Sequence, residues 1–371
     1  MNLSLCRHTT RLARAGFTLA ELLVAGTITV ILSGIMFSVI GQTSKILGRT
    51  TGKVEEFREA RNAFEAVTTR LSQATLNAYI DYDNAVTPTK YMRRSELRFI
   101  SGPSSQLMGA TPATKLRPTH AVFFQAPTGQ TAKLVNYASF ENLLCTCGYY
   151  LEVASDETVR PKFLVEKIAP FRYRPRLMEF SQPTEVNEIY FRTNGPVSQT
   201  YKGKEWYANY VSATNAPVHV VAENIVAFIV TPRLSPADEA QVKGATATTD
   251  PDGSPLAPKY LFDSAPQPLA PDTRYKDGRL NPTNQLPPML QVTLVAVDEP
   301  GAAALGYDKG NLDPLGVNTK FLNTTDYSKD LLVAGGADSL ESKLIAKHVN
   351  YRVFTTNVII RAAKWSREQT N

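Results

Sequence analysis

The first apolar segment of the chain begins with Arg14-Ala15-Gly16-Phe17-Thr18-Leu19-Ala20-Glu21-Leu22-Leu23-Val24-Ala25, which places one carboxylate, that of Glu21, among apolar side chains. From Phe17 to Ile40, only Glu21 and small or hydroxyl-bearing residues interrupt the aliphatic and aromatic ones. A helix of about 24 residues, at about 1.5 Å per residue, is long enough to cross the hydrocarbon core of a bilayer. We therefore expect residues 17–41 to form a transmembrane helix.

The charges around this segment predict its orientation. Arg7, His8, Arg11 and Arg14 precede it, and residues 1–16 contain no Asp or Glu. Basic residues favour the cytoplasmic side, so the N-terminus should be cytoplasmic and everything after Ile40 should lie outside. A carboxylate at membrane depth costs several kcal/mol and usually has a partner. We expect a cation beside Glu21.

The pattern Gly16-Phe17-Thr18-Leu19-x-Glu21-Leu22-Leu23-Val24 resembles the type IV prepilin signal of pilins and pseudopilins. The resemblance implies that a prepilin peptidase cuts between Gly16 and Phe17 and methylates the new amine of Phe17. It also implies that Glu21 guides subunit assembly. The new amine lies four residues before Glu21, on the same face of the helix, and can meet the carboxylate of its own chain or of a neighbour.

Two other interpretations of this segment remain open. An ordinary secretory signal peptide would be cut after the apolar region, near Ser33-Gly34 or Val39-Ile40-Gly41. A plain transmembrane anchor would not be cut. Neither explains Glu21, so we favour the prepilin interpretation.

Composition excludes some classes of function. The 371 residues carry a formal charge of +6, and removal of Arg7, Arg11 and Arg14 with the leader leaves 37 basic against 34 acidic residues, a charge of +3. This is no argument for binding nucleic acid. A hydrophobic content of 43% is ordinary for a globular protein, and the exterior part could form one large or two small domains.

Cysteine usage is sparse. Cys6 leaves with the leader, and only Cys145 and Cys147 reach the oxidising compartment. A bridge between the cysteines of a Cys-x-Cys pair closes a small, strained ring. A local disulfide, two buried thiols and a labile redox pair all remain open, and we favour a structural role.

The rest of the chain predicts an α+β fold. Apolar residues at helical spacing, from Phe57 to Ala78, predict an amphipathic helix over residues 42–80, with a bend or a melted turn near Gly41, Gly48 and Gly52. Residues 81–371 should form a β-rich extracytoplasmic domain with long loops. Its expected strands are Leu97–Ile100, Ala121–Gln125, Tyr149–Val153, Glu188–Arg192, Ile225–Thr231, Leu290–Asp298 and Tyr351–Ala362.

Two insertions interrupt these strands. Eleven of the 24 prolines lie in residues 232–288, which we expect to form a long surface excursion whose flanking strands pair. A second, flexible insertion should run from Glu299 to about Gly336. The alternation in residues 290–297 predicts a half-buried strand.

The sequence carries few candidates for a chemical site. His120, His219 and His348 are isolated in sequence. The acidic pairs Asp81/Asp83 and Asp250/Asp252 suggest calcium, but neither fits the twelve-residue calcium loop, and solvated turns are preferred. We expect no catalytic residue, metal or cofactor. Aromatic residues interleave with Arg172, Arg174 and Arg176, which predicts one buried and one solvated strand face.

Two wider resemblances concern the type of pilin. The segments Leu286–Leu294 and Tyr351–Val358 resemble the closing strands of J-type minor pseudopilins of type II secretion, which have a long helix packed on two small sheets. Further segments, among them Cys147-Gly148-Tyr149-Tyr150 and Arg172–Glu179, resemble the family called Verru_Chthon cassette protein C. That family implies three pilin-like or accessory partners and adds no chemistry.

These features together predict a minor pseudopilin of a type II secretion or type IV pilus-like filament in the inner membrane. Its partners would be the prepilin peptidase and sister subunits, with Gly26 and Gly34 permitting close helix approach. The alternative is a membrane-anchored binding protein or adhesin that uses the Pro-rich excursion for recognition. An enzyme with a pilin-type anchor comes third.

Overall fold

The computed structural model describes residues 18–84, 86–109, 111–131, 142–157, 160–161, 163–164, 168, 170–186, 207, 211, 216–246, 252–265, 280–307 and 310–365. The chain divides into two compact units, Met1–Val54 and Glu55–Asn371. The first unit contains most of a long apolar helix, and the second is a β-rich body. This confirms the predicted α+β class.

Helix α1 (Leu19–Ser72) is 54 residues long and helical throughout. The expectation of a melted turn near Gly41, Gly48 and Gly52 is therefore wrong. The helix also ends earlier than the expected residue 80, because the chain then joins the sheet: the Thr75 N–H donates to the Gln125 carbonyl oxygen at 2.9 Å.

The remaining described elements belong to the body. The helices are α2 (Ser104–Met108), α5 (Pro236–Thr246), α6 (Glu299–Leu305), α7 (Tyr327–Leu331) and α8 (Leu340–Ala346). Short 3₁₀ turns cover Thr184–Val186, Val317–Thr319, Thr324–Asp326 and Val333–Gly335. The strands are β1 (Tyr79–Tyr82), β2 (Tyr91–Arg94), β3 (Ile100–Pro103), β4 (His120–Pro127), β5 (Leu144–Ser155), β6 (Tyr173–Gln182), β7 (Val218–Glu223), β8 (Ile225–Arg233), β9 (Phe262–Asp263), β10 (Met289–Val297) and β11 (Tyr351–Ile359).

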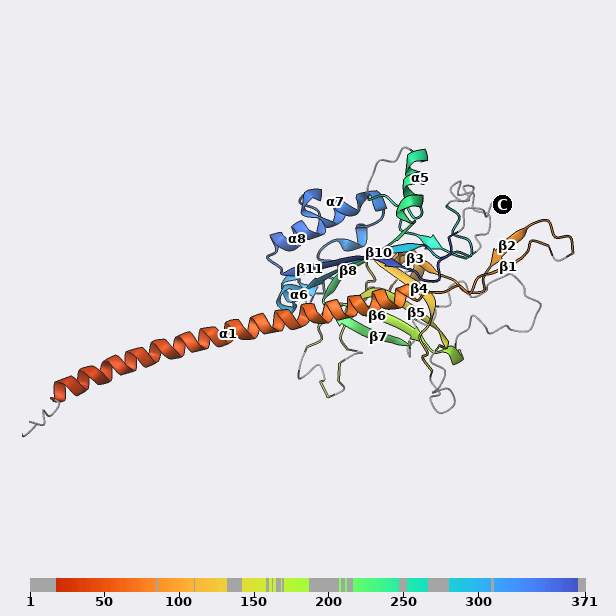
Figure 1. Ribbon diagram of the computed structural model, residues 1–371. Coiled ribbons are helices and arrows are strands. Elements are labelled where there is room, and N and C mark those ends of the chain that lie inside the picture. Colours follow the sequence, from red (N-terminus) through yellow and green to blue (C-terminus); the bar gives the residue numbers. More distant parts are fainter. Residues whose placement is uncertain are drawn as a thin grey trace, which may run out of the picture. The chain divides into compact units, whose positions relative to one another are not determined.

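The described strands form three antiparallel sheets (Figure 1). The largest has the order β7-β6-β5-β4-β3-β9, a second has the order β11-β10-β8, and β1 and β2 form a separate hairpin. Successive strands are mostly neighbours, which is typical of antiparallel sheets joined by short connections.

The main hydrophobic core lies between the two larger sheets and the last turns of α1. Residues of α1 that recur at helical spacing are buried in it: Ala60, Ala63, Phe64, Val67 and Leu71. They share this core with alternate residues of β4, β5, β8, β10 and β11, and the ring of Phe64 lies 5.8 Å from that of Phe354. Residues 57–72 are thus an integral part of the body.

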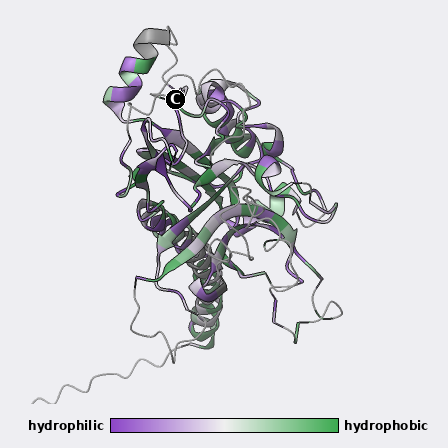
Figure 2. Ribbon diagram, turned by 90° about the vertical axis from the view of Figure 1, so that its right-hand side faces the viewer, coloured by the Kyte–Doolittle hydropathy of each residue, from purple (hydrophilic) through white to green (hydrophobic). Residues whose placement is uncertain are grey.

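Each of the two larger sheets also buries its other face. Val295 and Val297 of β10 pack with residues of α6, α7 and α8. Phe123 of β4 packs with Phe180 of β6 and stacks on Tyr207, with ring centroids 3.9 Å apart. Because both faces are covered, the central strands are apolar along much of their length, and several are coloured as hydrophobic in Figure 2.

Most of the expected strands are confirmed. Those at 121–125, 149–153, 225–231, 290–298 and 351–362 coincide with β4, β5, β8, β10 and β11. The strand expected at Leu97–Ile100 overlaps β3 only at Ile100, and Glu188–Arg192 lies outside the described residues. β8 and β10 pair as expected for the strands that flank residues 232–288.

Three expectations about the loops and strands are wrong. β10 is not half-buried, because it is the central strand of its sheet and is covered on both sides. The Pro-rich segment is not only a surface excursion, since Leu256, Tyr260 and Phe262 are buried. The segment from Glu299 to Gly336 is not a flexible insertion, because it folds into α6, α7 and short turns that cover β10.

His120 is buried where the two larger sheets meet. Its Nδ1 accepts a hydrogen bond from the Val230 N–H at 3.1 Å, and its Nε2 donates to the Phe321 carbonyl oxygen at 2.9 Å. Burial lowers the pKa of His120 from 6.5 to about 4. The folded chain therefore holds this imidazole in its neutral form at pH values where the unfolded chain protonates it.

We predict that the free energy of unfolding falls as the pH falls from 7 to 4, by up to about 3 kcal/mol through His120. The sign follows because the unfolded chain binds one more proton than the folded chain between the two pKa values. Urea unfolding of the full chain in detergent micelles at pH 7, 5.5 and 4 measures this loss. In His120→Asn, which is less stable overall, the loss should shrink by that amount; an unchanged pH dependence would show that His120 does not titrate on unfolding.

Candidate functional site

The first part of α1 is the most distinctive surface of the chain. Leu19–Thr43 is long and apolar enough to cross a membrane, although a signal sequence near an N-terminus meets the same criteria. The most apolar part of this segment is not buried within the described protein. Its exposed large apolar residues are Leu19, Leu22, Leu23, Val24, Ile28, Val30, Ile31, Leu32, Ile35, Met36, Phe37, Val39 and Ile40.

Thr18 and Glu21 form a capping box at the start of this helix. The Glu21 Oε2 atom accepts hydrogen bonds from the Thr18 N–H at 2.9 Å and from the Thr18 hydroxyl at 3.0 Å. In return, the Thr18 Oγ1 atom accepts one from the Glu21 N–H at 3.3 Å. This reciprocal arrangement satisfies backbone donors that a helix start otherwise leaves unpaired.

The capping box changes the interpretation of Glu21. Within the described residues, its carboxylate bonds to Thr18 of its own helix. The expected cation, an amine at Phe17, remains a prediction because Phe17 lies outside the described residues. The position, in the first turn of the helix, also favours a negative charge through the helix dipole. The sequence signal that would have identified this role is the Thr-x-x-Glu pattern ahead of the apolar segment.

The other two residues of the predicted processing site, Gly16 and Phe17, lie outside the described residues.

Two glycines of the apolar helix lie on its open surface. At Gly26 and Gly34, a Cβ atom added to the backbone would meet no heavy atom within 4 Å. Both glycines therefore lie on open helix surface.

Within the body, α1 is held to the six-stranded sheet by a polar cluster. The Arg70 guanidinium forms an ion pair with the Glu179 carboxylate of β6, and the Tyr149 hydroxyl of β5 donates to the same oxygen at 2.9 Å. This carboxylate is only 16% exposed, so the cluster is largely shielded from water. It positions the last turns of α1 on the sheet.

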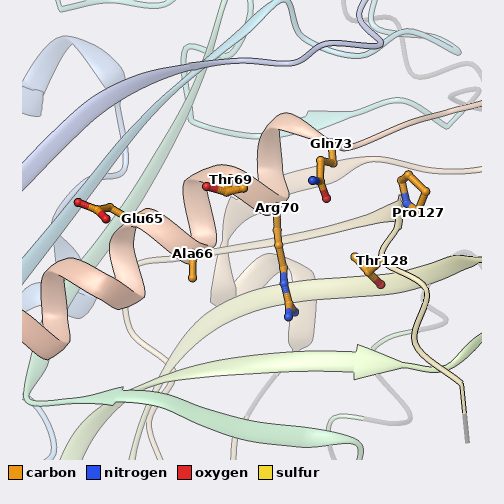
Figure 3. A pocket seen from close by; sticks show the side chains of 7 residues that line it. All are labelled: Glu65, Ala66, Thr69, Arg70, Gln73, Pro127 and Thr128. Atoms are coloured by element: carbon orange, nitrogen blue, oxygen red, sulfur yellow. The ribbon is translucent and has the colours of Figure 1, made fainter. Parts of the chain in front are cut away.

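A shallow hollow lies beside these turns (Figure 3). It is lined by Glu65, Ala66, Thr69, Arg70, Gln73, Pro127 and Thr128. Its two charged side chains are already paired, Glu65 with Arg61 and Arg70 with Glu179. Figure 3 shows Arg70 extending toward the strands while Glu65 points elsewhere, so the two do not converge on a common point in the hollow.

The two strand cysteines are free, buried thiols in β5. Of the three states that the sequence leaves open, the structure has this one. The Cys145 thiol donates to the Gln130 carbonyl oxygen at 3.2 Å. Burial raises the pKa of Cys147 to about 12. Because the thiolate is the reactive form, both the burial and the raised pKa favour inert, structural cysteines.

The acidic pair Asp81/Asp83 closes the β1–β2 hairpin. Asp81 pairs with Arg94 at 3.4 Å. The Asp83 carboxylate accepts hydrogen bonds from the Thr89 hydroxyl and from the Thr89 and Lys90 N–H groups, which lowers its pKa. Asp252 accepts a bond from the Ser328 N–H, and Asp250 lies outside the described residues. No group of three or more metal-ligating side chains occurs among the residues that the structure describes.

Arg174 and Arg176 of β6, and Arg172 just before it, do not form the expected solvated face. Arg174 and Arg176 are buried, and they pair with Glu299 of α6 at 2.6 Å and with Glu223 of β7 at 2.9 Å. Of the three, only Arg172 is largely exposed. These residues link β6 to its surroundings and do not form an open binding surface.

Comparisons with models of protein families, with curated proteins and with solved structures find no match for this chain. The apolar helix with its capping box therefore rests on its own geometry as the candidate functional site.

We predict that Cys145 and Cys147 do not react with a thiol reagent while the chain is folded. With a pKa of about 12, only about one Cys147 in ten thousand is a thiolate at pH 8. In a Cys6→Ser background, Ellman's reagent should label no thiols in the native chain and both after unfolding in urea. Rapid native labelling, or a mass lower by two hydrogens, would contradict buried free thiols.

Proposed function

We propose that this chain is a minor pseudopilin-like structural subunit of a filament related to type II secretion or type IV pili. The observation that carries the proposal is the exposed apolar part of α1, which begins with the Thr18–Glu21 capping box and follows Gly16-Phe17. Such a surface is costly in water and needs lipid or other helices around it.

The first turn of α1 supports a role in assembly. Glu21 uses Oε2 for both bonds to Thr18, and Oε1 accepts no bond from the part of the chain that the structure describes. That oxygen is open to a cation, such as the amine that cleavage before Phe17 would create. The carboxylate can therefore cap its own helix and still bind an amine of its own chain or of a neighbouring subunit.

The distribution of apolar side chains along α1 also supports an anchored subunit. Large apolar residues are exposed around the helix from Leu19 to Ile40, whereas those between Phe64 and Leu71 are buried in the body. Gly26 and Gly34 leave open helix surface on which a sister helix can approach closely. The body would then lie outside the inner membrane, with the basic leader on the cytoplasmic side.

The size of the body favours a minor subunit. Residues 55–371 form one compact unit. A unit of this bulk would obstruct the dense packing of many identical subunits in a helical filament. The chain is therefore better suited to be a subunit that is present in few copies or lies near the filament tip.

We predict that coexpression with a prepilin peptidase gives a mature chain that starts at N-methylated Phe17. Intact-mass and N-terminal peptide mass spectrometry measure this, with a Gly16→Leu variant as the uncut control. An intact Met1 under the same conditions, or a cut near Gly41, would refute the prepilin interpretation and leave an exported or anchored β-rich protein.

We also predict that the charge of Glu21 is needed for assembly and that its capping bonds alone are not. Glu21→Gln retains an oxygen that can cap the helix but has no charge, whereas Thr18→Val keeps the charge and loses the side-chain cap. Both variants should be cleaved normally. Copurification with sister subunits should fall at least tenfold in Glu21→Gln and by less than threefold in Thr18→Val; equal recovery of Glu21→Gln and the unaltered chain would show that Glu21 acts only as a cap.

A further inference from the structure

The two edges of the three-stranded sheet β11-β10-β8 differ in what satisfies their backbone groups. At the β8 edge, the Phe228 N–H donates to the Thr119 hydroxyl oxygen at 3.3 Å, and the Val230 N–H donates to His120 Nδ1 at 3.1 Å. All four residues are buried. Side chains at the start of β4 therefore close this edge.

At the β11 edge, no residue that the structure describes provides a corresponding closure. In an antiparallel ladder, successive residues of a strand direct their N–H and C=O groups alternately to one side and the other. The backbone groups of Phe228 and Val230 point away from β10. Leu294 and Val292 lie opposite them on β10, so the backbone groups of these two residues point toward β11. There they bond to Phe354 and Thr356. The backbone groups of Val353, Thr355 and Asn357 consequently face away from β10, and no described residue bonds to them.

β11 also lacks the usual protection of an edge strand. Natural edges are often short, bulged, or interrupted by proline or charge. Here the nine residues Tyr351–Ile359 pair with β10 without a register shift, contain no proline and carry one charge, that of Arg352. In the six-stranded sheet, by contrast, the edge strand β9 has two residues and β7 has a register shift against β6.

We propose that β11 is the docking edge for an extended strand of a different polypeptide. The incoming strand would bond to the outward backbone groups of Val353, Thr355 and Asn357. Thr355, Asn357 and Ile359 are exposed, so their side chains leave this edge accessible. Arg352 is exposed and forms no ion pair with the described residues, so the strand that fits best carries a carboxylate opposite it.

Pairing with a second copy through β8 is excluded by geometry. A head-to-tail contact would place β11 of one copy on the outer edge of β8 of another. The Phe228 and Val230 N–H groups at that edge are already bonded to Thr119 and His120. The partner edge is closed.

Pairing of two β11 strands would fix the relative direction of the last turns of α1 in the two copies. Phe64 lies beside Phe354, and the Arg361 N–H donates to the Ser72 carbonyl oxygen at 3.1 Å, so α1 and β11 run in the same direction there. Two antiparallel β11 strands would be related by a two-fold axis perpendicular to the sheet, which would reverse residues 64–72 of one copy relative to the other. Self-association through β11 would therefore set the last turns of α1 antiparallel in the two copies, and the concentration dependence described below distinguishes it from binding of a different polypeptide.

A synthetic strand tests the proposal directly. The full chain in detergent micelles is titrated with a soluble nine-residue peptide of alternating valine and threonine that carries one glutamate to face Arg352. Amide hydrogen exchange, resolved by residue with NMR, should slow at least tenfold at Val353, Thr355 and Asn357. The amides of Phe354 and Thr356 should not change, because β10 already binds them. A peptide with lysine in place of glutamate should bind at least fivefold more weakly.

Two variants connect the binding to this edge. Asn357→Pro removes an outward N–H, and Asn357→Ala is the matched control that keeps it. The proline variant should lose peptide binding at least tenfold relative to the alanine variant. If proline lowers the melting temperature of the chain, Arg352→Glu replaces it, and that variant should prefer the lysine peptide.

Several outcomes would overturn the proposal. Peptide binding without protection of the three amides would place the peptide elsewhere, and slow exchange of these amides in the free chain would mean that the edge is already covered. Protection that grows with the concentration of the chain alone would identify a second copy as the occupant. None of these results depends on cleavage at Gly16, so failure of the prepilin proposal would be recognised separately.

Discussion

Burial of one stripe of α1 between the two larger sheets is the constraint on which the rest of the body depends. Phe64, Val67 and Leu71 belong to the same core as alternate residues of β4, β8 and β10. Burying three such side chains contributes roughly 5–8 kcal/mol, which is comparable to the whole net stability of a typical domain. Helix α1, which also carries the exposed apolar segment, is therefore one of the elements that hold the body together.

Buried ion pairs connect the layers that surround this core. Arg174 of β6 pairs with Glu299 at the start of α6, and Arg98, just before β3, forms a two-pronged pair with Asp263 of β9. Charged pairs in low dielectric contribute little net stability, because desolvation offsets their attraction. Breaking one nevertheless leaves an uncompensated charge, so such pairs favour one arrangement of neighbouring strands over its alternatives. We infer that they specify how the strands meet, while the apolar core supplies the stability.

Sequence patterns correctly predicted the helices and strands that depend mainly on interactions between residues close together in the chain. The apolar segment, the amphipathic stripe and five of the strands follow from periodicity and turn residues, and the pairing of β8 with β10 followed from their position around one insertion. The errors arose where tertiary contacts dominate. The solvated face expected around Arg174 and Arg176 of β6 was wrong, because their partners Glu299 and Glu223 cannot be identified from sequence. The segments 252–265 and 299–336 resemble loops in sequence, although their few apolar residues fill gaps over β4 and β10.

The candidate site could be predicted only where it depends on a local sequence pattern. The Thr18–Glu21 capping box is a pattern of four residues and can be read from sequence, whereas the two unequal edges of the three-stranded sheet cannot. Thr119 adopts a φ of 57°, which is unusual for a β-branched residue, and this conformation goes with the hydrogen bonds that Thr119 and His120 accept from β8. The fold thus tolerates a strained residue and a buried imidazole to close one edge. β11 is as long as β8 and more regular, yet its outer edge remains open in the described chain, and the proposed strand partner would account for that difference.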